Sequence, residues 1–186
     1  MKKFSVVLLL CFNIAAVIAI IRYPEAEVIP HKKLTHALPQ TTPEWERSVL
    51  AAIPKVLAEF GENIKKAGRE YQVNHRLIVG VLITESMGNP NAESSTGARG
   101  CMQTLPSTDR EIGIRGDSFH CPTSIWKGTK YLSLLRDRYK LTPLIKVVAA
   151  YEKGPNRVVN YTQRDLLESD YLNKVAFVVE HLPKNF

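Results

Sequence analysis

The sequence predicts an all-α fold, and three observations support this prediction. The segments 56–71, 122–139 and 143–153 carry apolar residues at the three- and four-residue spacing of a helix. No segment shows the strict alternation of apolar and polar residues that is typical of a strand, and no Asn-Gly or Asp-Gly pair marks a hairpin. With 186 residues, of which 45% are hydrophobic, the chain can form one domain with a real core.

The predicted elements begin at residue 44. Thr42-Pro43-Glu44 reads as a helix start, because proline suits the first helical position and an acid suits the first turn. A short helix then runs to Ile53, and Pro54 either kinks it or begins a second helix that includes 56–71. Further helices are expected at 75–87, 106–112, 122–139 and 143–153, with one or two more within 163–180.

The N-terminal residues predict export from the cytoplasm. Lys2 and Lys3 precede an apolar run from Phe4 to Ile21, as in an export signal. This run is near the shortest length that spans a bilayer, so residues 1–21 are either a cleaved signal or a membrane anchor. Residues 22–43 are interrupted by several prolines and are predicted to be a linker, which leaves 44–186 as the domain.

The net charge and the cysteine content limit the possible binding partners and the possible cellular compartment. The formal net charge of +7 suits an anionic partner, but no basic helix with interleaved aromatic residues points to nucleic acid. The five histidines are scattered without ligand spacing, so we expect no metal and no cofactor. Outside residues 1–21 the chain has two cysteines, Cys101 and Cys121, and an even number in an exported domain favours a disulfide over two free thiols.

Glu85 is the candidate catalytic residue. It lies at the end of a helix that is apolar on every side from Leu77 to Ile83, as in a helix buried in a core. Asn74 is suited to cap the start of this helix, and Gly88-Asn89-Pro90 to end it. Burial and the C-terminal end of a helix both disfavour a carboxylate, so both raise its pKa toward that of a general acid near neutrality. The alternative on this stretch alone is a glutamate that simply caps an exposed helix end.

Three ordered motifs follow one another along the chain. The first combines Glu85-Ser86, Asn89-Pro90, Ser94 and Gly97-Ala98-Arg99-Gly100-Cys101-Met102-Gln103; the second is Ala150-Tyr151-Glu152-Lys153-Gly154-Pro155, and the third is Tyr171-Leu172-Asn173-Lys174-Val175. They resemble the patterns of the lytic transglycosylases that are related to goose-type lysozyme. Those patterns are Glu-Ser, Asn-Pro, Ser and Gly-Ala-x-Gly-x-Met-Gln, then Ala-Tyr-Asn-Ala-Gly-Pro, then Tyr-x-x-Lys-Val. The resemblance runs from about residue 53 to 182. It implies a lysozyme-like fold, in which a very small β-hairpin can follow Glu85.

The resemblance also implies a reaction with one carboxylate. Glu85 would protonate the glycosidic oxygen between N-acetylmuramic acid and N-acetylglucosamine in peptidoglycan, and would then take the proton from the C6 hydroxyl as a 1,6-anhydro ring closes. No water is activated, and the substrate's acetamido group would stabilise the oxocarbenium-like state, so a second carboxylate is not needed. The carboxylates that lie outside the motif positions are assigned to the solvated surface: Glu93, Asp109, Glu111 and Asp117.

The motif positions suggest residues that bind the substrate. Ser94 would hydrogen-bond the substrate or orient Glu85, unless it is an ordinary polar loop residue. Gln103 would contact acetamido or peptide groups, and Tyr151 would stack on the sugar or hydrogen-bond to it and to Glu85. Tyr131 is a weaker candidate of the same kind, for which a core position is an equal alternative.

Other motif positions are assigned to structure. Gly97 and Gly100 would let the backbone approach the sugar closely, and Tyr171 is expected to be structural. A bridge from Cys101 to Cys121 would pin a wall of the cleft, at a position where the family usually has an apolar residue.

Glu152 and Lys153 depart from the family pattern, which has Asn and Ala at these positions. A carboxyl next to Tyr151 could change the polarity of the substrate site, perturb Glu85 as a modulator, or act as a second carboxylate. The two side chains could equally form a solvated ion pair.

Three functions remain open. The first is a lytic transglycosylase that acts on peptidoglycan glycan strands in the periplasm of the bacterial cell envelope, with membrane attachment through residues 4–21 if the signal is retained. Its small size suggests local opening of the wall for a secretion, conjugation or pilus machine. The second is a hydrolytic, lysozyme-type muramidase, which needs a second carboxylate. The third is a non-catalytic wall-binding assembly factor, which does not need Glu85.

Overall fold

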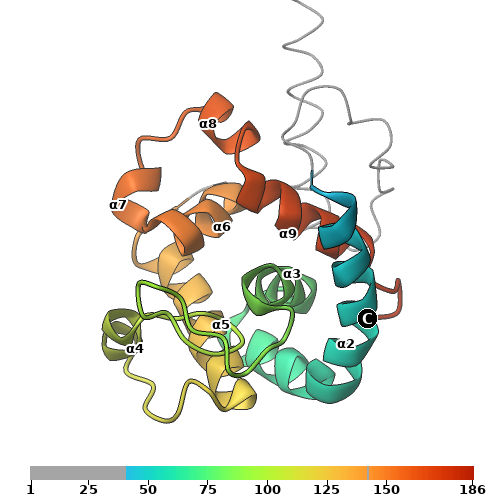
Figure 1. Ribbon diagram of the computed structural model, residues 1–186. Helices are drawn as coiled ribbons and strands as arrows, with labels where there is room; N and C mark the ends of the chain where they lie inside the picture. The colour runs from blue at the N-terminus through green and yellow to red at the C-terminus, as the bar shows by residue number, and fades with distance from the viewer. Residues whose placement is uncertain (1–40, 142) are drawn as a thin grey trace, which may run out of the picture.

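The computed structural model describes residues 41–141 and 143–186 (Figure 1). Its helices are α2 (Pro43–Tyr71), α3 (His75–Ser86), α4 (Pro106–Ile112), α5 (Cys121–Asp137), α6 (Leu144–Lys153), α7 (Pro155–Val158), α8 (Gln163–Leu167) and α9 (Asp170–Glu180). The described residues form no strand, which confirms the all-α prediction. The hairpin considered after Glu85 is reduced to two isolated bridges, Glu93 to Arg99 and Arg99 to Thr104.

The predicted export segment, 1–21, and nearly all of the predicted linker, 22–43, lie outside the described residues. In the part of the chain that the structure describes, no helix is both long enough and apolar enough to cross a membrane.

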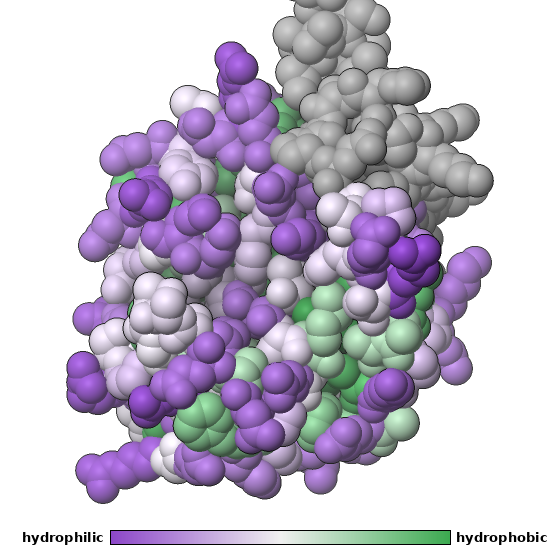
Figure 2. Space-filling view, in the orientation of Figure 1, coloured by the Kyte–Doolittle hydropathy of each residue, from purple (hydrophilic) through white to green (hydrophobic). Residues whose placement is uncertain are grey.

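Helix α2 is a single helix that passes through Pro54. The Thr42 side chain caps its start by accepting a hydrogen bond from the Trp45 backbone N–H. Pro54 lies on the exposed face of the helix, one turn after Leu50, which is itself 48% exposed. The Leu50 carbonyl, which loses its helical partner at Pro54, can therefore be hydrated, and this lowers the cost of the proline. Figure 2 shows that apolar side chains reach the surface beside α2.

Helix α3 lies at the centre of the molecule, with α2, α5, α6 and α9 around it (Figure 1). Every residue from Leu77 to Ile83 is buried, as the apolar pattern predicts. A Cβ on Gly80 would lie 2.8 Å from Val179 Cγ2, so this glycine lets α3 and α9 approach closely. Arg76 adds a polar tie, since its guanidinium donates to the carbonyl of Val179 at 3.0 Å.

The loop that follows α3 is fastened to α5 by a disulfide. Cys101 is joined to Cys121, the first residue of α5, with 5.4 Å between their Cα atoms, which confirms the predicted bridge. Gly100 packs beside it with φ +74°, and a Cβ at this position would lie 1.8 Å from the Ser118 carbonyl oxygen. Gly100 is therefore needed for the packing of this loop, which is a separate reason for glycine from the predicted close approach of a sugar. At Gly97, by contrast, a Cβ would meet no atom within 4 Å, so no neighbouring group requires a glycine at that position.

A buried ion pair holds α4 against α5, and it corrects the surface assignment of Asp109. Lys127 in α5 is only 2% exposed, and its Nζ lies 2.7 Å from Asp109 Oδ2. The same ammonium donates to Ser118 Oγ and to the Gly116 carbonyl, each at 2.8 Å, and Asp109 Oδ1 accepts from Thr104 Oγ1 at 2.8 Å. Asp109 is thus a structural carboxylate, because a buried lysine needs a paired anion and satisfied donors.

Replacing both Cys101 and Cys121 with serine is expected to destabilise the fold without abolishing it. In the chain-entropy account a bridge that closes a loop of this size contributes about 3 kcal/mol, or roughly 10 °C in Tm for a chain of this length. Thermal unfolding followed by circular dichroism, with and without a reductant, measures this change in Tm. A Tm that is unchanged in the double variant would contradict the bridge, and the control is that reductant lowers the Tm of the wild type only.

Candidate active site

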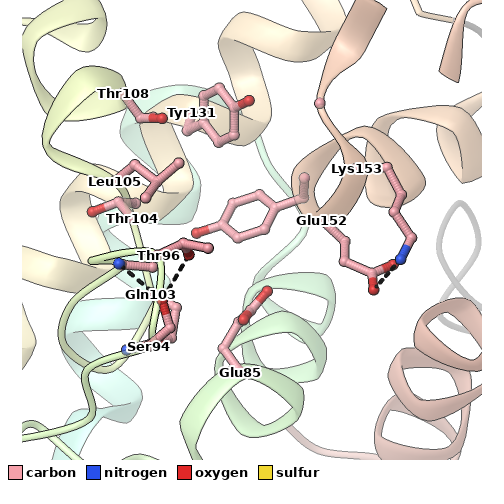
Figure 3. A pocket seen from close by; sticks show the side chains of 13 residues that line it. Glu85, Ser94, Thr96, Gln103, Thr104, Leu105, Thr108, Tyr131, Glu152 and Lys153 are labelled. Carbon is pink, nitrogen blue, oxygen red and sulfur yellow. Dashed lines mark hydrogen bonds and ion pairs between the residues drawn. The ribbon is translucent and has the colours of Figure 1, made fainter. Parts of the chain in front are cut away.

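A pocket of about 390 Å³ lies beside the C-terminal end of α3 (Figure 3). It is lined by the end of α3, the loop from 94 to 105, α4, α5 and the end of α6. The lining residues are Glu85, Ser94, Thr96, Ala98, Gln103, Thr104, Leu105, Thr108, Tyr131, Tyr151, Glu152, Lys153 and Gly154. All the predicted catalytic, substrate-binding and modulating residues are among them, which are Glu85, Ser94, Gln103, Tyr131, Tyr151 and Glu152.

Glu85 enters the pocket from the last turn of α3. The hydroxyl of Tyr171, in the first turn of α9, donates a hydrogen bond of 2.6 Å to Glu85 Oε1. Burial raises the pKa of Glu85 from 4.5 to about 7; the hydrogen bond from Tyr171 opposes this shift and the negative charge of Glu152 adds to it. Glu85 is therefore present both as an acid and as a carboxylate near neutral pH.

Ser86, the partner of Glu85 in the Glu-Ser motif, fixes the end of α3 to the loop. Its Oγ donates to the Cys101 carbonyl at 2.8 Å and accepts from the Gly88 backbone N–H at 3.1 Å. Met87 ends the helix in the left-handed conformation, with φ 55°. The position of the Glu85 carboxyl relative to the loop is thus set by a hydrogen bond from the adjacent residue.

Ser94 and Gln103 line the pocket, and part of their hydrogen-bonding capacity is used to shape the loop. Ser94 Oγ accepts from the Ala98 backbone N–H at 3.0 Å and pairs with Thr96 Oγ1 at 2.9 Å. Gln103 Nε2 donates to the carbonyls of Ala92 and Gly100, at 2.8 and 2.9 Å. Among the described residues Ser94 has no hydrogen bond to Glu85, and no group donates to the Gln103 side-chain carbonyl, which leaves this oxygen as an acceptor for a ligand.

The hydrogen bond to Glu85 comes from Tyr171, which we expected to be structural, and not from Tyr151, which nevertheless lines the pocket. Tyr151 donates to the Met102 carbonyl at 2.7 Å, and Tyr171 makes the bond to Glu85. Burial and the negative charge of Glu85 raise the pKa of both tyrosines well above the usual value, so both remain neutral donors. Tyr131 packs on Tyr151 with ring centroids 5.3 Å apart, and burial raises its own pKa to about 12.

Two residues that sequence reasoning missed are Tyr171 and Gly128. Tyr171 could have been found from its spacing, since Val175 and Val178 follow on the same buried face of the helix that packs on α3. A Cβ on Gly128 in α5 would lie 2.6 Å from Tyr151 Oη and 2.5 Å from Met102 Cε. Nothing in the local pattern around Gly128 signals this approach, because it depends on how α6 and the loop pack on α5.

Glu152 and Lys153 form the opposite side of the pocket from Ser94 and Gln103 (Figure 3). Lys153 Nζ lies 2.8 Å from Glu152 Oε1. The pocket therefore offers two carboxyls and one ammonium, together with several hydroxyl and amide groups.

In the described part of the chain, no three His, Cys, Asp or Glu side chains come together as a group that could hold a metal ion.

Replacing Glu85 with glutamine is expected to stabilise the protein at alkaline pH. Because the pKa of Glu85 in the folded protein is about 7, the folded state binds this proton more tightly than the unfolded chain does. The resulting stabilisation is complete below about pH 4.5 and is lost as the pH rises through about 7. Above that pH the variant avoids a buried carboxylate and should gain about 1–3 kcal/mol, which raises the Tm by several degrees.

Thermal unfolding of wild type and Glu85→Gln between pH 4 and 9 tests this expectation. The two Tm curves should meet at the acid end and separate above neutrality. Glu59→Gln, at an exposed site in α2, is the control and should follow the wild type. Parallel curves for wild type and Glu85→Gln at all pH values would contradict a raised pKa.

Comparison with known proteins places the chain in a family. The family model described as the transglycosylase SLT domain matches residues 62–172. The transglycosylase of Enterobacteria phage PRD1 is 33% identical over 99 residues, which cover 53% of this chain and 36% of that protein. Membrane-bound lytic murein transglycosylase C of Histophilus somni is 34% identical over 118 residues, which cover 55% of this chain and 32% of that protein. The chain thus matches about a third of the length of these relatives.

Solved structures agree on the fold. The lytic transglycosylase Slt of Pseudomonas aeruginosa, solved as an inactive mutant, has a TM-score of 0.55 at 22% identity and covers 67% of this chain and 23% of that one. The 70 kDa soluble lytic transglycosylase Slt70 of Escherichia coli has a TM-score of 0.56 at 23% identity and covers 73% and 26%. These likenesses confirm the lysozyme-like, all-α fold. Because the family model spans more than half of the sequence and contains every residue of the pocket, this chain belongs to the transglycosylase SLT domain family.

Proposed function

We propose that this protein is a peptidoglycan lytic transglycosylase in which Glu85 acts first as the acid and then as the base. The observation that carries the proposal is the position of Glu85, which lies in a polar pocket with a pKa of about 7 and a hydrogen bond from Tyr171. The relatives named lytic murein transglycosylases support the substrate class.

The geometry suits a residue that both gives and takes a proton. When the pKa of a group lies near the working pH, a large fraction of the molecules carry it protonated and a large fraction carry it deprotonated. Tyr171 occupies Oε1 of Glu85, so Oε2 is the oxygen that would protonate the glycosidic bond between N-acetylmuramic acid and N-acetylglucosamine. As the bond breaks, the same carboxylate would accept the C6 hydroxyl proton, and the hydroxyl oxygen would close the 1,6-anhydro ring at C1. The hydroxyl of Tyr171 stabilises the carboxylate between the two steps.

The pocket wall opposite Glu152 suits an amino sugar. Ser94, Thr96 and Thr108 present hydroxyl groups, and Gln103 presents a free carbonyl oxygen. Such groups would bind the sugar hydroxyls and the acetamido N–H without adding charge. Tyr131 and Tyr151 provide aromatic surface at the same wall, and Tyr151 is held by its bond to Met102.

The proposal extends to location and partners. The relatives are named membrane-bound or soluble lytic murein transglycosylases, which supports action in the bacterial cell envelope. We place the chain in the periplasm, exported or anchored through residues 1–21 and followed by a linker to about residue 43 and a catalytic domain from 44 to 186. We further propose that this activity opens the wall locally for a secretion, conjugation or pilus machine.

A hydrolytic muramidase is the second candidate, and one observation favours it. Glu152 lies in the same pocket as Glu85, and a second carboxylate is what a hydrolase needs to activate water. The products of the two reactions differ by one water.

Mass spectrometry of muropeptides released from purified peptidoglycan decides between these functions. Wild type is expected to release products that are lighter than hydrolysed muropeptides by one water, and Glu85→Gln to release about 10³-fold less. Products of full hydrolysed mass would instead support the muramidase, with Glu152→Gln as the variant that removes its base. A Glu85→Gln variant that cleaves as fast as wild type would contradict both.

The pH dependence of kcat/KM should respond to Tyr171 and Glu152 in opposite directions. Activity is expected to fall above about pH 7, because the first step needs protonated Glu85. Tyr171→Phe removes a bond that lowers the pKa of Glu85, so the alkaline limb should move to higher pH. Glu152→Gln removes a charge that raises this pKa, so the limb should move to lower pH. Profiles that move together, or not at all, would contradict the assigned electrostatics.

A further inference from the structure

The charged groups of the pocket are confined to one side. Among the lining residues only Glu85, Glu152 and Lys153 carry charge, and Glu85 is the catalytic candidate. The residues between Ser94 and Thr108 that line the pocket are all neutral. Glu152 and Lys153 therefore form a separate recognition element, which we call the charged edge, at the end of α6 (Figure 3).

The ion pair of the charged edge can be exchanged for a ligand at little cost. The side chains of Lys153 and Glu152 are 41% and 31% exposed, and in the described residues neither has another ion pair or side-chain hydrogen bond. Solvent-exposed pairs of this kind contribute only about 0–1 kcal/mol. The two side chains thus lie close together in an ion pair that contributes little stability. A ligand that carries both a carboxylate and an ammonium group can replace this pair by pairing with each side chain.

The space beside the charged edge is open. Gly154 follows Lys153 and lines the pocket, with φ +81°. A Cβ built on Gly154 would meet no atom within 4 Å. A substituent on a bound sugar can therefore leave the pocket past Gly154 and lie next to Lys153 and Glu152.

The chemistry of a glycan strand indicates which group would lie there. The sugars of peptidoglycan carry hydroxyl and acetamido groups and no charge, because the lactyl carboxyl of the muramoyl residue is consumed in its amide bond to the peptide branch. Free carboxylates and free amines occur in the peptide branch alone. We propose that the charged edge binds this branch, with Lys153 taking a branch carboxylate and Glu152 a branch ammonium.

This proposal deepens the proposed function by naming the substrate as peptide-bearing glycan, and it rests on that function. It also explains why Glu152 and Lys153 occur together, since each would bind one of the two charged groups of the branch. An ammonium and a carboxylate on neighbouring residues match a ligand that carries both charges, whereas the neutral wall of the pocket cannot distinguish a strand with branches from one without them.

Binding measured in the Glu85→Gln background tests the proposal without interference from cleavage. Soluble peptidoglycan fragments are compared with the same fragments after the branch carboxylates are converted to methylamides, and after the branch amines are acetylated. With Glu85→Gln alone, each modification is expected to weaken binding about 5-fold, the size of one exposed charged contact. Adding Lys153→Met should weaken binding to untreated fragments to the same extent and remove the response to methylamidation. Adding Glu152→Gln should do the same for acetylation.

Lys66→Met, at an exposed site in α2 that does not line the pocket, is the matched control and should keep both responses. The proposal is overturned if the modified fragments bind as well as the untreated ones, or if Lys153→Met leaves the response to methylamidation intact. It is also overturned if untreated fragments do not bind at all. The release of lighter products by wild type is scored separately, so a failure of the proposed function remains distinguishable from a failure of the charged edge.

Discussion

Helix α3 is buried on all sides, and its last turn carries the carboxyl group of Glu85. The other features of the structure depend on this arrangement. Because Leu77 to Ile83 are buried, helices pack around α3 from several directions, and its end is held against the loop that forms the pocket wall. The same burial removes water from Glu85 and raises its pKa to about 7. A carboxylate in this position disfavours the fold at alkaline pH, and the hydrogen bond from Tyr171 offsets part of that cost. The stability of the fold and the protonation state of Glu85 are therefore linked.

The pocket wall lacks regular secondary structure, yet it is held at several points. The Cys101–Cys121 bridge joins it to α5, and Tyr151 donates to the Met102 carbonyl from α6. Gln103 closes the loop on itself through the carbonyls of Ala92 and Gly100. The hydrogen bonds among these contacts are accepted by backbone carbonyls, so hydroxyl groups and the side-chain carbonyl of Gln103 remain among the groups that line the pocket. In the proposed function this wall would position a neutral sugar, and the proposed role of the charged edge is to bind a charged group.

The parts of the fold that the sequence predicted are those set by local patterns. The apolar run around Glu85, the cap at Asn74 and the start of α4 at Pro106 depend on neighbouring residues, and the structure shows each of them. The bridge followed from cysteine parity in an exported domain. The four-residue helix α7 was missed because it is too short to show periodicity.

The parts that could not be predicted depend on how distant helices cross. Tyr151 and Tyr171 both occupy motif positions, and only the packing of α6 and α9 on α3 decides which hydroxyl reaches Glu85. The pairing of Asp109 with Lys127 likewise required the approach of α4 to α5, since a charged residue in a short helix is normally solvated. Sequence patterns identified Glu85 as the candidate carboxylate, and tertiary contacts determined its partners.

Direct titration of Glu85 tests the central claim, which is that burial at the end of α3 holds its carboxyl partly protonated at neutral pH. The side-chain carboxyl carbons of glutamate can be labelled with ¹³C and followed by NMR from pH 3 to 9, with Glu85→Gln assigning the resonance by its loss. A resonance that titrates with a pKa of about 7 is the predicted result. A Glu85 carboxyl that titrates near 4.5, as an ordinary exposed glutamate does, would contradict the account.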